Sequence, residues 1–100
     1  MARAGHRVTF DTAESLALEA LAFLTADARR LQRFLSLTGL SPQRLTAEAE
    51  APATLAAVLE HFSGDESLLL VFTASGGHDP SLIAPALAVL RAAAAGTAPP

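Results

Sequence analysis

The stretch Asp27–Pro42, which reads DARRLQRFLSLTGLSP, contains the signals for one helix, its end and the start of another. Asp27 is a preferred N-cap residue, because its carboxylate accepts hydrogen bonds from backbone N–H groups of the first turn. Gly39 can adopt the left-handed conformation in which many helices end, and Ser41 with Pro42 provides a new cap and a first-turn proline. Between these signals, the residues of one helix face recur at the expected spacing: Leu31, Phe34, Leu35 and Thr38.

The same signals occur on both sides of this stretch. Before it, Asp11 can cap a helix while Glu14 reaches back from the third position, as in a capping box. After it, Gly64 and Asp65 separate two further helices, and Pro85 is expected to kink or split the last helix because it removes one backbone hydrogen bond. The predicted helices span 11–25, 28–38, 42–49, 52–63, 66–75 and 80–94. Their stops and caps are predicted at Asp27, Gly39, Pro42, Asp65, Gly77 and Pro80.

The composition places the chain in the all-α class. Ala occurs 23 times and Leu 17 times in 100 residues, and both favour helices. Tyr and Trp are absent and Ile occurs once, so the residues that favour strands are scarce. We expect a compact bundle of about five to six short helices. It would form a single domain over 11–95, with a flexible N-terminal tail over 1–10 and a frayed C-terminal tail over 96–100.

The sequence partly matches itself after a shift of 38 residues, as from Asp27 to Asp65. The matches fall on caps, helix stops and apolar positions, which together define a helix–helix–short-helix unit. Two such units, related by duplication or by convergence on the same helix signals, would pack face to face. The helices 11–25 and 66–75 are apolar around most of their circumference, so we expect both at the centre. The identical pairs are Ala13 and Ala51, Leu21 and Leu59, Asp27 and Asp65, Leu31 and Leu69, Phe34 and Phe72, Gly39 and Gly77, and Pro42 and Pro80.

Large apolar side chains at helical spacing make up the predicted core. Isolated helices of this length are marginal in water, so the bundle depends on burying these side chains. Phe34 and Phe72 occupy equivalent places in the two units, and we expect both to anchor the core. The predicted core anchors are Leu21, Leu24, Leu31, Phe34, Leu59, Phe62, Leu69 and Phe72.

Motifs that carry chemistry are scarce. Cysteine and lysine are absent, which excludes thiolate metal sites, cysteine nucleophiles and lysine Schiff bases. His6, His61 and His78 lack the i, i+4 spacing that places two metal ligands on one helix face. Gly76 and Gly77 follow a helix rather than a strand, so a helix stop explains them better than a phosphate-binding loop. We therefore expect no catalytic residue, no metal site and no cofactor, and we expect that the protein is not an enzyme.

Arg29, Arg30 and Arg33 form one basic cluster in the N-terminal half of a predicted helix. Positive charge at this end opposes the helix dipole, which suggests a face for an external anionic partner. The alternative is a solvated face, or one paired with nearby acids such as Glu19 or Asp27.

The segment 27–50 has the helix–turn–helix outline of some DNA-binding domains. Its second helix, however, includes or precedes Glu48 and Glu50, and the chain has a net charge of −3. Because DNA affinity depends chiefly on neutralising phosphates, these charges argue against nucleic-acid binding. A nucleic-acid-associated regulator is therefore the alternative function and not the main prediction.

The two strongly apolar helices suggest a protein–protein surface instead. If a domain of this size leaves part of either helix uncovered, the patch would favour a homodimer or another protein partner. If both helices are fully central, no such patch remains. The main prediction is a non-enzymatic protein-interaction or structural domain. It has no membrane partner, because no apolar run approaches the length of a membrane span.

Two long segments carry a family resemblance: AESLALEALAFLTADARRLQRFLSLTGLSPQRL from Ala13 to Leu45, and LAAVLEHFSGDESLLLVFTASGGHDPSLI from Leu55 to Ile83. Over about residues 12–95 the chain resembles a short bacterial family known only as a domain of unknown function. The resemblance implies a small helical protein of the cytoplasm and assigns no activity to it. The absence of Lys and Asn, whose codons are AT-rich, likewise indicates a GC-rich bacterial genome.

Overall fold

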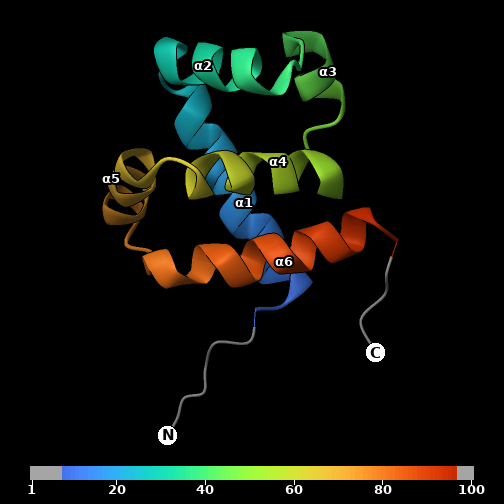
Figure 1. Ribbon diagram of the computed structural model, residues 1–100, viewed down its shortest axis with the longest axis vertical. Helices are drawn as coiled ribbons and strands as arrows, with labels where there is room; N and C mark the ends of the chain where they lie inside the picture. The colour runs from blue at the N-terminus through green and yellow to red at the C-terminus, as the bar shows by residue number, and fades with distance from the viewer. Residues whose placement is uncertain (1–7, 97–100) are drawn as a thin grey trace, which may run out of the picture.

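The computed structural model describes residues 8–96, and every regular element among them is helical (Figure 1). The prediction of an all-α bundle of short helices is thereby confirmed. The elements in chain order are α1 (Phe10–Thr25), α2 (Ala28–Thr38), α3 (Pro42–Ala47), α4 (Pro52–Ser63), α5 (Glu66–Gly76), the 3₁₀ helix η1 (Pro80–Leu82) and α6 (Ile83–Ala94).

The ends of α2 and α5 follow the same local chemistry. The carboxylate of Asp27 accepts hydrogen bonds from two backbone N–H groups at the start of α2, and that of Asp65 accepts one at the start of α5. Both helices end on a left-handed glycine, Gly39 with φ 76° and Gly77 with φ 70°. Each helix has 11 residues, and the two coincide after the shift of 38. A repeat that arose by duplication stays a prediction.

The first helix begins earlier than predicted. The N-cap of α1 is Thr9, whose hydroxyl accepts the backbone N–H of Thr12, and Asp11 lies inside the first turn. Asp11 was the wrong cap because a hydroxyl two residues earlier already satisfies the first turn. Phe10 therefore belongs to α1 and not to an N-terminal tail. Val8, also assigned to that tail, packs against the core. Residues 1–7 and 97–100 of the predicted tails lie outside the described residues.

The last predicted helix is divided near its proline. Asp79 caps the 3₁₀ helix that starts at Pro80, and α6 starts only at Ile83. Pro85 is then the third residue of α6, where a backbone N–H has no partner within the helix in any case. The division lets the chain accept Pro85 without losing a hydrogen bond from the middle of a helix.

The centre of the bundle consists of α1, α4 and α6. In Figure 1, α4 and α6 lie side by side in opposite directions, and α1 crosses behind both. Ala13, Ala17, Ala20 and Ala86 are fully buried in these helices. Such small side chains let helix axes approach closely.

The prediction that 66–75 is a central helix is wrong. The corresponding helix, α5, packs mainly on α4 and η1 at one side of the molecule (Figure 1). Leu70 is 47% exposed and Val71 is 50% exposed. The α5 helix has bulky side chains where α1 has alanines, so it covers the edge of the α1–α4–α6 centre and does not enter it.

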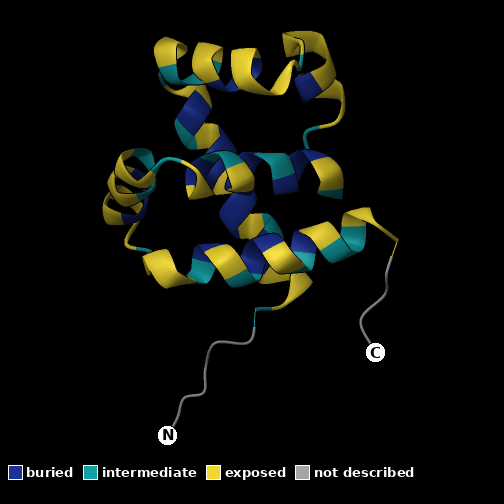
Figure 2. Cartoon of the chain, viewed as in Figure 1, coloured by how far each residue is buried: buried dark blue, intermediate teal, exposed yellow. Residues whose placement is uncertain are grey.

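Most predicted core anchors are buried. Figure 2 shows buried residues concentrated where α1, α4 and α6 face one another. Leu31 and Leu69 depart from the prediction, because they pack against the core but remain partly exposed. They occupy matching turns of α2 and α5, the two helices at the periphery, where one flank stays in solvent. The buried anchors are Leu21, Leu24, Phe34, Leu59, Phe62 and Phe72.

Candidate functional site

Six aromatic rings from α1, α2, α4, α5 and the loop after α5 meet in one cluster, which we call the aromatic cluster. Phe62 of α4 lies at its middle, with ring centroids 5.1 Å from Phe72 of α5 and 6.2 Å from Phe23 of α1. The cluster fastens α2 and α5 to the central helices. Its members are Phe23, Phe34, His61, Phe62, Phe72 and His78.

His61 enters the aromatic cluster from α4 without a polar partner. Its ring meets Phe34 edge-on at 5.2 Å, and its Nε2 atom is buried with no hydrogen bond inside the described part of the chain. Burial lowers the pKa of His61, the positive charge of Arg33 lowers it further, and Asp65 opposes both effects. The neutral imidazole therefore acts chiefly as an aromatic packing group.

His78 lies at the opposite end of the cluster. Its Nε2 atom is 2.9 Å from a carboxylate oxygen of Glu19 on α1, and its ring stacks at 5.4 Å on Phe72. A Cβ atom on Gly76 would lie only 2.7 Å from the His78 ring, so a larger residue there would require the ring to shift. The His78 side chain is only 21% exposed and links the end of α5 to α1.

The predicted basic cluster divides into two kinds of arginine. The guanidinium of Arg30 lies 4.1 Å from the centroid of the Phe23 ring, in cation–π geometry. Arg29 and Arg33 are exposed on α2, and neither forms an ion pair within residues 8–96. The predicted partner Glu19 is bound to His78 instead.

Charge is unevenly distributed along the chain. Residues 28–47 contain four arginines and no acidic residue, whereas all ten acidic residues lie outside this segment. Elsewhere in the described residues the one arginine is Arg91. Within the segment, Arg44 pairs with Glu48 just beyond it at 3.4 Å. The α2–α3 end of the molecule is therefore the cationic end.

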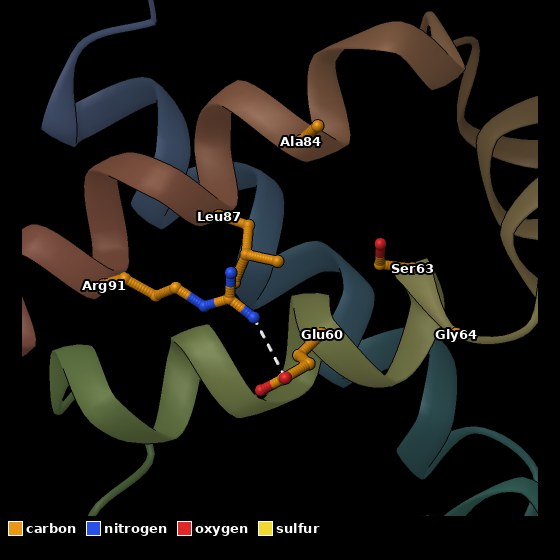
Figure 3. Close-up of a pocket in the computed structure, with 6 residues that line it drawn as sticks. All are labelled: Glu60, Ser63, Gly64, Ala84, Leu87 and Arg91. Atoms are coloured by element: carbon orange, nitrogen blue, oxygen red, sulfur yellow. Dashed lines mark ion pairs between the residues drawn. The ribbon is translucent and has the colours of Figure 1, made fainter.

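A shallow hollow of about 390 Å³ lies between α4 and α6. Figure 3 shows Glu60 and Arg91 directed toward each other across it, with 2.9 Å between the carboxylate and the guanidinium. Both side chains are more than half exposed, so the pair is screened by solvent. No sequence pattern indicates this pair, because Glu60 and Arg91 are far apart in the chain.

Within residues 8–96, no group of three or more His, Asp or Glu side chains could hold a metal ion. None of the described helices combines the length and apolar character needed to cross a bilayer. The exposed Leu37 on α2 was missed in the sequence, although its position off the Leu31–Phe34–Leu35 face could have indicated it.

Comparisons with known proteins connect this arrangement to one family. No curated protein and no solved structure matches the chain. A family model described as "Protein of unknown function (DUF3572)" matches residues 10–93, which include all seven elements except the last residue of α6. The chain therefore belongs to the family DUF3572.

Proposed function

We propose that this protein is a non-enzymatic interaction domain of the bacterial cytoplasm that pairs with a second copy of itself through α5. The observation that carries the proposal is the outer face of α5, where Leu70 and Val71 are each about half exposed. Two adjacent large apolar side chains in water favour association, because pairing removes their surface from solvent.

The charge of α5 suits pairing with an identical helix. Glu66, in its first turn, is the only charged residue of this 11-residue helix. In a two-fold contact the same surface faces itself, so like charges at its centre would repel. An antiparallel arrangement of two α5 helices keeps the two Glu66 carboxylates at opposite ends and leaves only uncharged side chains in the middle.

The state of the ionisable groups supports a non-enzymatic role. The pKa of Asp27 is lowered mainly by the backbone hydrogen bond from Arg30, and the pKa of His61 is lowered mainly by burial. Asp27 is a helix cap and His61 belongs to the aromatic cluster. Neither lines the hollow between α4 and α6. Both shifts thus have a structural explanation.

The alternative of a nucleic-acid-associated regulator receives less support. In a helix–turn–helix reader the second helix enters the major groove. Here α3 has only six residues, and Glu48 and Glu50 follow it directly. A gel shift with duplex DNA at low salt tests the alternative, since the phosphate contribution to affinity is largest there.

Size-exclusion chromatography with light scattering tests self-association of the full chain. We expect a mass that rises toward the dimer with protein concentration, and a monomer for the double variant Leu70→Ser, Val71→Ser. Leu37→Ser is the matched control, because Leu37 is 64% exposed but lies on α2. A monomeric wild type at every concentration, or a dimer that survives the double substitution, would refute pairing through α5.

A further inference from the structure

We propose that the outer face of α2 binds an acidic polypeptide segment of another protein, with carboxylates on Arg29 and Arg33 and an apolar side chain on Leu37. This surface, called the α2 face below, is separate from the α5 face. Its test therefore has its own outcome, whatever the result for self-association.

The three residues of the α2 face form one line along the helix. They are spaced four residues apart, so successive side chains lie about 6 Å from each other on the same side. Arg29, Arg33 and Leu37 are all exposed, and Leu37 is 64% exposed. Two cationic positions followed by one apolar position form a recognition pattern that an acid–acid–apolar segment complements.

The α2 face is held in place from behind. Asp27 fixes the start of α2 and the left-handed Gly39 fixes its end. Phe34 of the same helix is fully buried, with its ring against His61. The guanidinium of Arg30 packs over the Phe23 ring and covers it from solvent. A partner would therefore meet a rigid helix whose backbone needs no rearrangement on binding.

Charge identifies the chemistry of the partner. Residues 28–47 contain no acid, and Asp27, the cap of α2, is the one carboxylate that acts electrostatically on Arg29 from this helix. Neither Arg29 nor Arg33 forms an ion pair within the described residues. Arg29 lies in the first turn of α2, where a positive charge opposes the helix dipole, and Arg33 is the middle residue of the helix. An anion docked at this place offsets that repulsion. A second copy presenting the same face would instead bring arginine against arginine.

Two observations favour a polypeptide over a nucleic acid. Leu37 offers an apolar contact that a phosphate backbone does not use. Outside 28–47 the described residues contain ten acidic residues and only Arg91 as an arginine. A long, densely charged duplex would be repelled by this acidic body, whereas a short acidic segment touches the cationic end alone.

Fluorescence anisotropy with a defined probe tests the proposal. The probe is a labelled helical peptide with two Glu four residues apart and a Leu four residues further; its analogue carries Gln in place of both Glu. We expect the full-length protein to bind the Glu peptide and to bind the Gln analogue at least about tenfold more weakly. Arg29→Gln, Arg33→Gln and Leu37→Ser should each weaken binding of the Glu peptide, by several-fold to about tenfold.

Matched variants separate a specific site from general attraction. Arg91→Gln removes the same charge from α6, and Leu70→Ser removes an exposed leucine from α5, so both should leave affinity unchanged. No binding of the Glu peptide at low salt would overturn the proposal. An equal loss with Arg91→Gln would also overturn it, as would tighter binding of a single-stranded or duplex oligonucleotide that depends on the same arginines.

His61 supplies a second, local readout. Its pKa is lowered partly by the positive charge of Arg33, so a carboxylate bound to Arg33 should raise it. We expect an NMR titration to show this rise when the wild-type protein is saturated with the Glu peptide, and not in Arg33→Gln. An unchanged His61 titration in the saturated wild type would place the peptide elsewhere and overturn the proposal.

Discussion

At the scale of single residues, His61 and His78 show how position decides the role of one side chain. Both contact the aromatic cluster, but His78 has the carboxylate of Glu19 at 2.9 Å, whereas Nε2 of His61 is buried with no hydrogen bond among the described residues. Burying one nitrogen of a partly buried imidazole disfavours the charged form and lowers the pKa of His61, because a charge there would lose part of its hydration. His61 therefore makes the fold sensitive to acid.

We predict that folding stability declines as the pH falls below 6.5, the ordinary value for His61. The pKa of His61 is lower in the folded protein than in the unfolded chain, so the unfolded chain binds a proton first as the pH falls. The stability that neutral His61 contributes is therefore fully present above pH 6.5 and is lost as the pH falls through the folded pKa. Urea unfolding across this range would measure it. His61→Phe should flatten the dependence in this window. An identical pH dependence in both proteins would contradict the assignment.

The two equivalent phenylalanines should be the most sensitive core positions. Phe34 is fully buried and Phe72 is 2% exposed. Replacing either with Ala leaves a cavity, so each should lose about 3–5 kcal/mol of unfolding free energy, enough to unfold a small domain. Thermal melts measure the loss. Leu37→Ala is the control and should change stability by less than about 0.5 kcal/mol. Harmless substitutions at both phenylalanines would refute the core assignment.

At the scale of elements, helix length is set by local hydrogen bonds and backbone conformation. The α2 helix begins where the Asp27 carboxylate accepts backbone N–H groups and ends where Gly39 turns left-handed. These features involve residues within four positions of each other, so they form wherever the helix is placed. The α5 helix likewise ends where Gly77 adopts the left-handed conformation, although α5 packs against different helices.

Gly39→Ala should destabilise the protein through its backbone alone. A Cβ atom at Gly39 would meet nothing within 4 Å, but its φ of 76° is unfavourable for alanine. The expected loss is about 1–2 kcal/mol of unfolding free energy in urea titrations. Gly64→Ala is the control: it ends α4 at φ −88° with only ordinary contacts, so stability should stay constant or rise by up to about 1 kcal/mol. Equal losses in both variants would exclude the conformational explanation.

At the scale of the whole molecule, the bundle has a tightly packed centre and two outer helices with different surfaces. The α1, α4 and α6 helices share the most extensive packing, while α5 rests mainly on α4 and η1. The α2 face is cationic and the α5 face is apolar. The two proposals accordingly assign different partners to these faces: a second copy of the chain to the α5 face and an acidic segment to the α2 face.

The peripheral position of α5 predicts its dynamics. Because α5 can detach by breaking fewer contacts than α4, its amide hydrogens should exchange at lower opening free energy than those of α4. Native-state hydrogen exchange at low protein concentration, where association is minimal, would show this order. Equal protection of the two helices would mean that α5 unfolds only with the centre.

The sequence by itself determined the helices and most of their ends. Asp27, Gly39, Asp65 and Gly77 were identified because a cap or a left-handed stop acts on its immediate neighbours. The sequence also identified the cationic residues of α2, because a cluster of arginines can be recognised before the fold is known. The first cap was missed because Thr9 and Asp11 are both acceptable acceptors, and only the geometry of the turn chooses between them.

Only the tertiary structure decided which helices occupy the centre and which side chains meet. The apolar run Leu68–Phe72 predicted a central α5, yet alanine-rich α1 and α6 pack closely with α4 and leave α5 outside. The pairs Glu19–His78 and Glu60–Arg91 likewise depend on how helices cross. The physical reason is that the hydrophobic effect favours burial of an apolar side chain against any apolar neighbour. The shapes and volumes of the side chains then decide which helices can pack together closely.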